Sequence, residues 1–62
     1  MNVNDASYRF EIQERIRFRA SKAPGIVTGR FHFQGVNKYL VRYKIDQGIT
    51  DDWFEESLLE KR

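Results

Sequence analysis

The chain has 62 residues, no cysteine, one histidine and a formal net charge of +2. A chain this short forms one domain at most, and without cysteine it has neither disulfides nor thiolate metal sites. Since His32 has no histidine or cysteine companion, we expect no structural zinc, no other metal and no cofactor.

Aromatic residues make up 15% of the chain, which favours a folded protein with a dense core. No stretch approaches the roughly 20 apolar residues of a membrane span. Residues 1–7 are polar and do not resemble a signal peptide, so we expect a loose start, a single domain over residues 8–62 and, by default, a cytoplasmic location.

Residues 8–20 alternate between apolar and polar side chains, which predicts a half-buried strand. A helix is the alternative, because four apolar residues here are also spaced by four. Phe10 and Phe18 would lie off that helical stripe, so we favour the strand. Glu14 breaks the apolar parity, so we expect a bend near Gln13 and Glu14.

A turn is expected at residues 22–25, where proline presets φ and glycine supplies the positive φ that turns often need. A second strand follows at about residues 26–34. Its alternation places Phe31 and Phe33 on the inward face, together with Val27.

Residues 34–37 are expected to form a loop before a third strand at about residues 38–45. A three-residue hairpin loop at residues 46–48, with glycine in the left-handed position, leads to a fourth strand at about residues 49–54. Residues 55–59 predict a short helical turn that places Leu58 or Leu59 on the open end of a barrel.

Four or five short strands with a final turn are typical of a small barrel or sandwich. The order of the pieces at residues 10–18, 25–29, 39–43 and 52–59 resembles the SH3-like small barrels. The last two pieces resemble small phage or prophage proteins of this class, which often end in an acidic residue, a Trp or Phe pair, then Glu and Leu. The resemblance implies a mainly β, SH3-like barrel of four to five antiparallel strands with a short C-terminal helical turn. Many functions share such a fold.

A weaker resemblance links the chain to the short SH3-like type II dihydrofolate reductases, which build one active site at the centre of a homotetramer. It rests on Gly-Ile-Val-Thr-Gly at residues 25–29, Tyr-Leu-Val at residues 39–41 and the Leu-Glu near the C-terminus. That family has Val-Gln-Ile-Tyr on its functional strand, whereas this chain has Thr-Asp-Asp-Trp at residues 50–53. In such a homotetramer, the carboxylates of Asp51 and Asp52 from each chain would surround the central symmetry axis.

The residues otherwise indicate a non-enzymatic protein. Nucleophilic catalysis needs a hydroxyl or thiol beside a base that a third group orients, and His32 is the single histidine of a chain without cysteine. The glycines are isolated and form no phosphate-cradling loop.

The charge is unevenly distributed along the chain. Residues 1–44 carry nine Lys/Arg and three Asp/Glu, whereas residues 45–60 carry six Asp/Glu and no Lys/Arg. If the second and third strands pair about residues 35–37, Arg30 lies opposite Arg42, and the next hairpin places Asp52 beside Arg42. Internal neutralisation of the two halves is one interpretation.

A binding surface is the other interpretation. We expect a non-enzymatic binding module whose partner is a protein or a second copy of the chain, with the adjacent pair Trp53 and Phe54 as the strongest anchor unless Trp53 fills the core. The candidate residues for protein binding are Trp53, Phe54, Asp51 and Asp52. The alternative is a nucleic-acid-binding barrel with a basic strand face. Its candidate residues are Arg17, Arg19, Arg30, Arg42 and Lys44.

Overall fold

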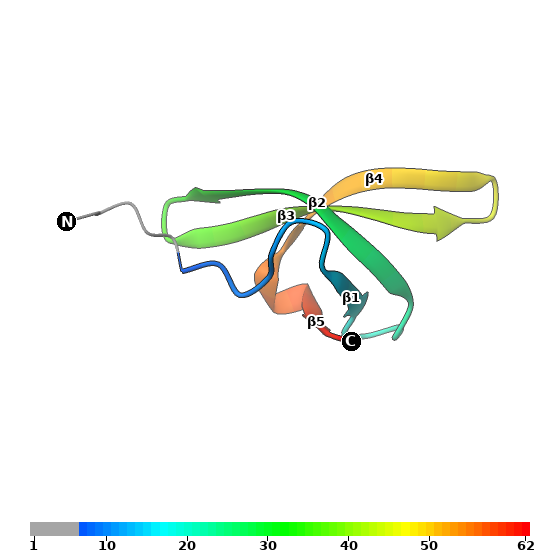
Figure 1. The fold of residues 1–62 in the computed structure, drawn as a ribbon, viewed down its shortest axis with the longest axis horizontal. Coiled ribbons are helices and arrows are strands. Elements are labelled where there is room, and N and C mark those ends of the chain that lie inside the picture. The colour runs from blue at the N-terminus through cyan, green and yellow to red at the C-terminus, as the bar shows by residue number, and fades with distance from the viewer. Residues whose placement is uncertain (1–6) are drawn as a thin grey trace.

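The computed structural model describes residues 7–62 (Figure 1). In chain order it contains β1 (Arg15–Phe18), β2 (Pro24–Phe33), β3 (Val36–Ile45), β4 (Gly48–Glu55), the 3-10 segment η1 (Glu56–Leu58) and β5 (Leu59–Lys61). The five strands form one antiparallel sheet in the order β4-β3-β2-β1-β5. The prediction of a mainly β fold with four to five antiparallel strands and a short C-terminal helical turn is confirmed. The loose start predicted for residues 1–7 lies, apart from Ser7, outside the described residues.

The core lies on one face of the long strands. In Figure 1, β1, η1 and β5 all lie on the same side of β2, β3 and β4, and we call this the inner face and the opposite one the outer face. Leu59, which starts β5, is fully buried in this core, whereas Leu58 is 52% exposed. The fully buried apolar residues are Phe10, Ile16, Val27, Tyr39, Val41 and Leu59.

The predicted strand over residues 8–20 is confirmed only at β1 and is wrong before Arg15 and after Phe18, whereas the predicted bend near Gln13 and Glu14 is confirmed. Gln13 has a left-handed φ of 77°, and the N–H of Glu14 donates to the carbonyl of Glu11 at 3.1 Å. The Glu14 carboxylate in turn accepts the N–H of Glu11 at 2.9 Å. These bonds close a tight turn, so the apolar alternation upstream reflects a loop that buries Phe10, and not a strand.

The predicted turn at residues 22–25 is also misplaced. Lys22, with φ at 65°, lies in the connection, and β2 begins at Pro24. Gly25 is buried inside β2, where a Cβ would lie 2.6 Å from Cγ1 of Val41. Glycine is required here because two strands approach closely, and not because a turn needs a positive φ.

The β2–β3 connection is shorter than the predicted loop at residues 34–37. Gln34 and Gly35 have φ values of 52° and 81°, and Phe33 pairs directly with Val36. Two consecutive positive φ values are typical of the two-residue type I′ hairpin. As a result, Arg30 lies opposite Tyr39, and the predicted pairing of Arg30 with Arg42 is wrong.

A β-bulge between Val27 and Gly29 reverses the parity of β2. Before the bulge, Val27 pairs with Val41 and both are buried. After it, Phe31 and Phe33 lie on the outer face, 40% and 60% exposed, so their predicted inward placement is wrong.

The β3–β4 connection differs from the predicted three-residue loop at residues 46–48 by one position. Gly48, with φ at 139°, already belongs to β4. Each partner on β4 is therefore displaced by one residue, and Arg42 lies opposite Asp51 instead of Asp52.

Candidate protein-binding surfaces

The outer face of β2, β3 and β4 carries a cluster of apolar side chains in direct cross-strand register. Leu40 of β3 lies opposite both Gly29 of β2 and Trp53 of β4, and Val36 lies opposite Phe33. We call this cluster the outer aromatic face. Its residues are Phe31, Phe33, Val36, Leu40 and Trp53.

Trp53 stands at the centre of the outer aromatic face. Its ring centroid lies 4.9 Å from that of Phe31 in an edge-to-face arrangement, and 48% of Trp53 remains exposed. A Cβ at Gly29 would lie 3.6 Å from Cη2 of the indole, so the missing side chain leaves room for the ring. Trp53 therefore does not fill the core and is half exposed on the outer face.

Charged residues on the outer face are arranged in two opposed columns. On β3 the column is basic, with Lys38 and Arg42, and on β4 it is acidic, with Glu55 opposite Lys38 and Asp51 opposite Arg42. Arg42 donates to both carboxylate oxygens of Asp51 at 3.0 and 3.1 Å. This bidentate hydrogen bonding lowers the pKa of Asp51 and raises that of Arg42.

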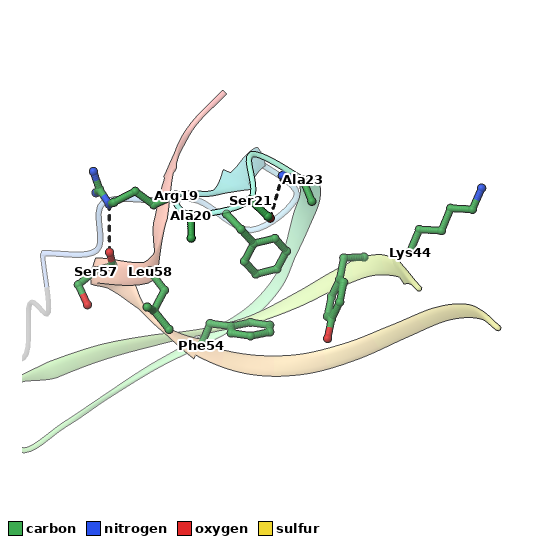
Figure 2. Close-up of a pocket in the computed structure, with 10 residues that line it drawn as sticks. Arg19, Ala20, Ser21, Ala23, Lys44, Phe54, Ser57 and Leu58 are labelled. Atoms are coloured by element: carbon green, nitrogen blue, oxygen red, sulfur yellow. Dashed lines mark hydrogen bonds between the residues drawn. The ribbon is translucent and has the colours of Figure 1, made fainter. Parts of the chain in front are cut away.

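A second candidate surface, an apolar groove on the inner face, lies between the β1–β2 connection, β3, β4 and η1 (Figure 2). It has a volume of about 530 Å³. Its aromatic residues pack edge-to-face, with ring centroids 4.8 Å apart for Phe18 and Phe54 and 5.1 Å apart for Phe18 and Tyr43. Leu58 of η1 lines it and is 52% exposed. The remaining lining residues are Arg19, Ala20, Ser21, Ala23, Lys44 and Ser57.

The predicted protein-binding residues divide between these two surfaces. Trp53 and Asp51 lie on the outer face, whereas Phe54 lines the inner groove. Asp52 is also on the inner face, where it accepts the hydroxyl proton of Tyr43 at 2.9 Å and thereby raises the pKa of that phenol.

The predicted nucleic-acid residues do not form one free basic face. Arg17 and Arg19 approach Glu60 at 2.6 and 3.7 Å, and Lys22 joins them at 2.9 Å. Hydrogen bonds from Lys22 and Arg17 lower the pKa of Glu60. Three cations therefore share one carboxylate near the C-terminus.

Arg30 is directed toward the N-terminal loop instead of solvent. Its guanidinium donates to the carbonyl of Phe10 at 2.9 Å and lies 4.5 Å from the ring centroid of Tyr8. The β2 bulge turns this side chain to the inner face, so Arg30 helps to fasten the loop. Of the five predicted arginines and lysines, only Lys44 forms no ion pair or side-chain hydrogen bond among residues 7–62.

A polar cluster that the sequence did not predict fastens the same loop to the sheet. The hydroxyl of the buried Tyr39 donates to the Glu56 carboxylate, which also accepts from Asn37 at 3.1 Å and from the N–H of Arg9 at 3.2 Å. Burial alone would raise the pKa of Glu56, but these hydrogen bonds outweigh it and lower the pKa. Burial, and then the bond to Glu56, raises the pKa of Tyr39 to about 12.

Residues 7–62 contain no group of three or more His, Cys, Asp or Glu side chains that could hold a metal ion. His32 is exposed, and its Nδ1 lies 2.7 Å from Oδ1 of Asn37. Among the same residues there is no helix of the length and apolarity needed to cross a bilayer. Comparisons with protein-family models, with curated proteins and with solved structures find no match to this chain.

Proposed function

We propose that this chain is a non-enzymatic protein-binding module of the SH3-like small-barrel kind, and that the outer aromatic face is its interface. The five antiparallel strands, with a 3-10 segment before the last one, support the fold assignment. The observation that carries the function is the exposure of Trp53 against Phe31 on the outer face of the sheet. Exposed Trp at the centre of an apolar patch is typical of interface anchors.

The partner that fits this face best is a second copy of the chain. In a two-fold pairing of outer faces, β3 of one copy lies over β4 of the other. The basic column of Lys38 and Arg42 then faces the acidic column of Glu55 and Asp51 in both directions. The face is therefore self-complementary in charge as well as apolar. Self-association would also add stability to a 62-residue chain whose core is small and which has no disulfides.

Static light scattering from low-micromolar to millimolar concentration tests the proposal. The mass of the wild type should rise toward that of a dimer, and Trp53→Ser should abolish the rise. Leu58→Ser is the matched control, because it removes a similarly exposed apolar side chain from the inner groove. A wild type that stays monomeric at millimolar concentration would exclude a second copy as the partner.

A charge exchange sharpens the test. Lys38→Glu places like charges across the proposed two-fold interface and should weaken association. Adding Glu55→Lys to Lys38→Glu restores the complementarity and should restore association. If the double variant associates no better than the single one, the columns do not face each other in the dimer.

A further inference from the structure

We infer that the apolar groove on the inner face binds an acidic, apolar segment of a partner polypeptide. The aromatic lining residues Tyr43 and Phe54 are on the opposite face of β3 and β4 from the outer aromatic face, and Lys44 lies at the edge of the groove, so the inference does not rest on self-association. One molecule can use both surfaces together.

The groove is formed to accept large apolar side chains. Its volume of about 530 Å³ is within the usual range of small-ligand sites. Leu58 and Phe54 point toward it from η1 and β4, and the small side chains of Ala20 and Ala23 line it from the β1–β2 connection (Figure 2). More than half of Leu58 is exposed, so an incoming aliphatic or aromatic side chain would remove considerable apolar surface from water.

The charges around the groove select an acidic partner. The groove lining contains Arg19 and Lys44 and no carboxylate. A smaller neighbouring groove shares Tyr43 and Lys44 with it and adds Arg15, Arg42 and Arg62, again with no Asp or Glu side chain in its lining.

Several of these cations have no internal counter-charge. Arg15, Lys44 and Arg62 form no ion pair within residues 7–62, whereas Arg19 lies near Glu60 and Arg42 is held by Asp51. The one carboxylate bonded to an aromatic lining residue is Asp52, which accepts from Tyr43. Of these three unpaired cations, Lys44 lines the apolar groove itself, and Arg15 and Arg62 line the neighbouring one. An acidic segment that extends from the apolar groove into its neighbour would supply their counter-charges.

The ring arrangement favours a polypeptide over single-stranded nucleic acid. Bases bind by stacking on exposed aromatic faces. Here Phe18 lies edge-to-face against both Tyr43 and Phe54, and Tyr43 lies 5.7 Å from Phe54 in the same geometry. The three rings pack against one another, which leaves less of their faces for a base to stack on. The remaining lining of the groove includes the aliphatic Leu58 and two alanines.

An amide-resolved NMR titration of the full chain tests the inference. The probe is a short synthetic peptide with Leu-Phe at its centre and Asp and Glu on both sides, and the control peptide carries Lys in place of each acidic residue. The acidic peptide should shift the amides of Phe18, Tyr43, Phe54 and Leu58, and the basic peptide should not. Added salt should weaken the binding, because exposed charges contribute to it.

Matched variants separate the two surfaces. Leu58→Ser should weaken peptide binding about tenfold, since burial of a leucine side chain is worth about that factor. Trp53→Ser, on the other face, should leave the peptide affinity unchanged. Lys44→Glu should weaken binding and flatten its salt dependence, whereas Lys38→Glu should do neither.

Three results would overturn the inference. The first is an absence of shifts at millimolar peptide. The second is a set of shifts centred on Phe31 and Trp53 instead of the groove. The third is tighter binding of an oligothymidine than of the acidic peptide at the same amides, which would assign the groove to nucleic acid.

Discussion

Trp53 and Phe54 are neighbours in the chain, but their side chains lie on opposite faces of β4. Trp53 packs against Phe31 on the outer face, and Phe54 packs against Phe18 on the inner face, with centroid distances of 4.9 and 4.8 Å. The pair that the sequence suggested as one anchor therefore serves two surfaces, because successive residues of a strand point to opposite sides.

This division predicts unequal effects on folding. Phe54→Ala removes a partly buried ring that packs on the core and should lower the free energy of unfolding by about 2–3 kcal/mol. Trp53→Ala removes a ring that is half exposed and should cost about 1 kcal/mol or less in the monomer. Urea denaturation at low-micromolar concentration measures both values. Equal losses would mean that the two rings contribute equally to the core.

Gly25→Ala should destabilise the chain by about 1–3 kcal/mol, because the added methyl overpacks the contact with Val41. The added Cβ would lie 2.6 Å from Cγ1 of Val41, so Val41→Ala in the same chain should recover part of the loss as a favourable coupling energy. Thermal unfolding of the two single variants and the double variant measures that coupling. Strictly additive losses would show that the two residues do not interact.

Tyr39 should make stability fall at alkaline pH. Its pKa in the folded chain is about 12 against an ordinary value of 10.0, so an unfolded chain loses this proton first. The stabilisation is complete below pH 10 and is lost as the pH rises toward 12, by about 3 kcal/mol in total. Tyr39→Phe lacks this titration, so its unfolding free energy should change less across the same window. Parallel curves for the two proteins would contradict the assignment.

Glu60 should restrain Arg17 and Arg19 from binding polyanions. Glu60→Gln removes the carboxylate that the two arginines share with Lys22, so retention on immobilised heparin should move to higher salt. Asp46→Asn is the control, because it makes the same change of charge in the β3–β4 hairpin loop, where Asp46 forms no ion pair or hydrogen bond with these cations. Equal displacement of both variants would mean that only net charge matters.

Much of the fold could be predicted from periodicity and turn residues. The third and fourth strands, the final 3-10 segment and the burial of Tyr39 and Val41 follow from alternation and from Gly48. The register could not be predicted in the same way. A two-residue turn at Gln34 and Gly35 has no Asn-Gly or Asp-Gly signature, and the longer loop that we expected places Arg30 opposite the wrong residue.

Which residues lie on the outer and inner faces depends on a β-bulge that has no local signal in the sequence. The bulge at Thr28 exchanges the two faces of β2, which brings Phe31 beside Trp53 and sends Arg30 to the inner face. Counting alternate residues along the strand takes no account of a bulge. It therefore predicted that Phe31 and Phe33 are buried and that Arg30 is exposed, the reverse of what the structure has. The Tyr39–Glu56 bond also has no local sequence signal, since its partners are 17 residues apart and lie in β3 and η1.

The emission of Trp53 tests the central claim most directly, because it is the single tryptophan of the chain and lies in the proposed interface. When the protein is diluted from millimolar to low-micromolar concentration, we expect its emission maximum to move to the red and acrylamide quenching to increase. Both changes should follow the fall in mass measured by light scattering. An emission spectrum that is constant over the whole range, at the 7.4 kDa mass of one chain, would contradict an interface between two copies at the outer aromatic face.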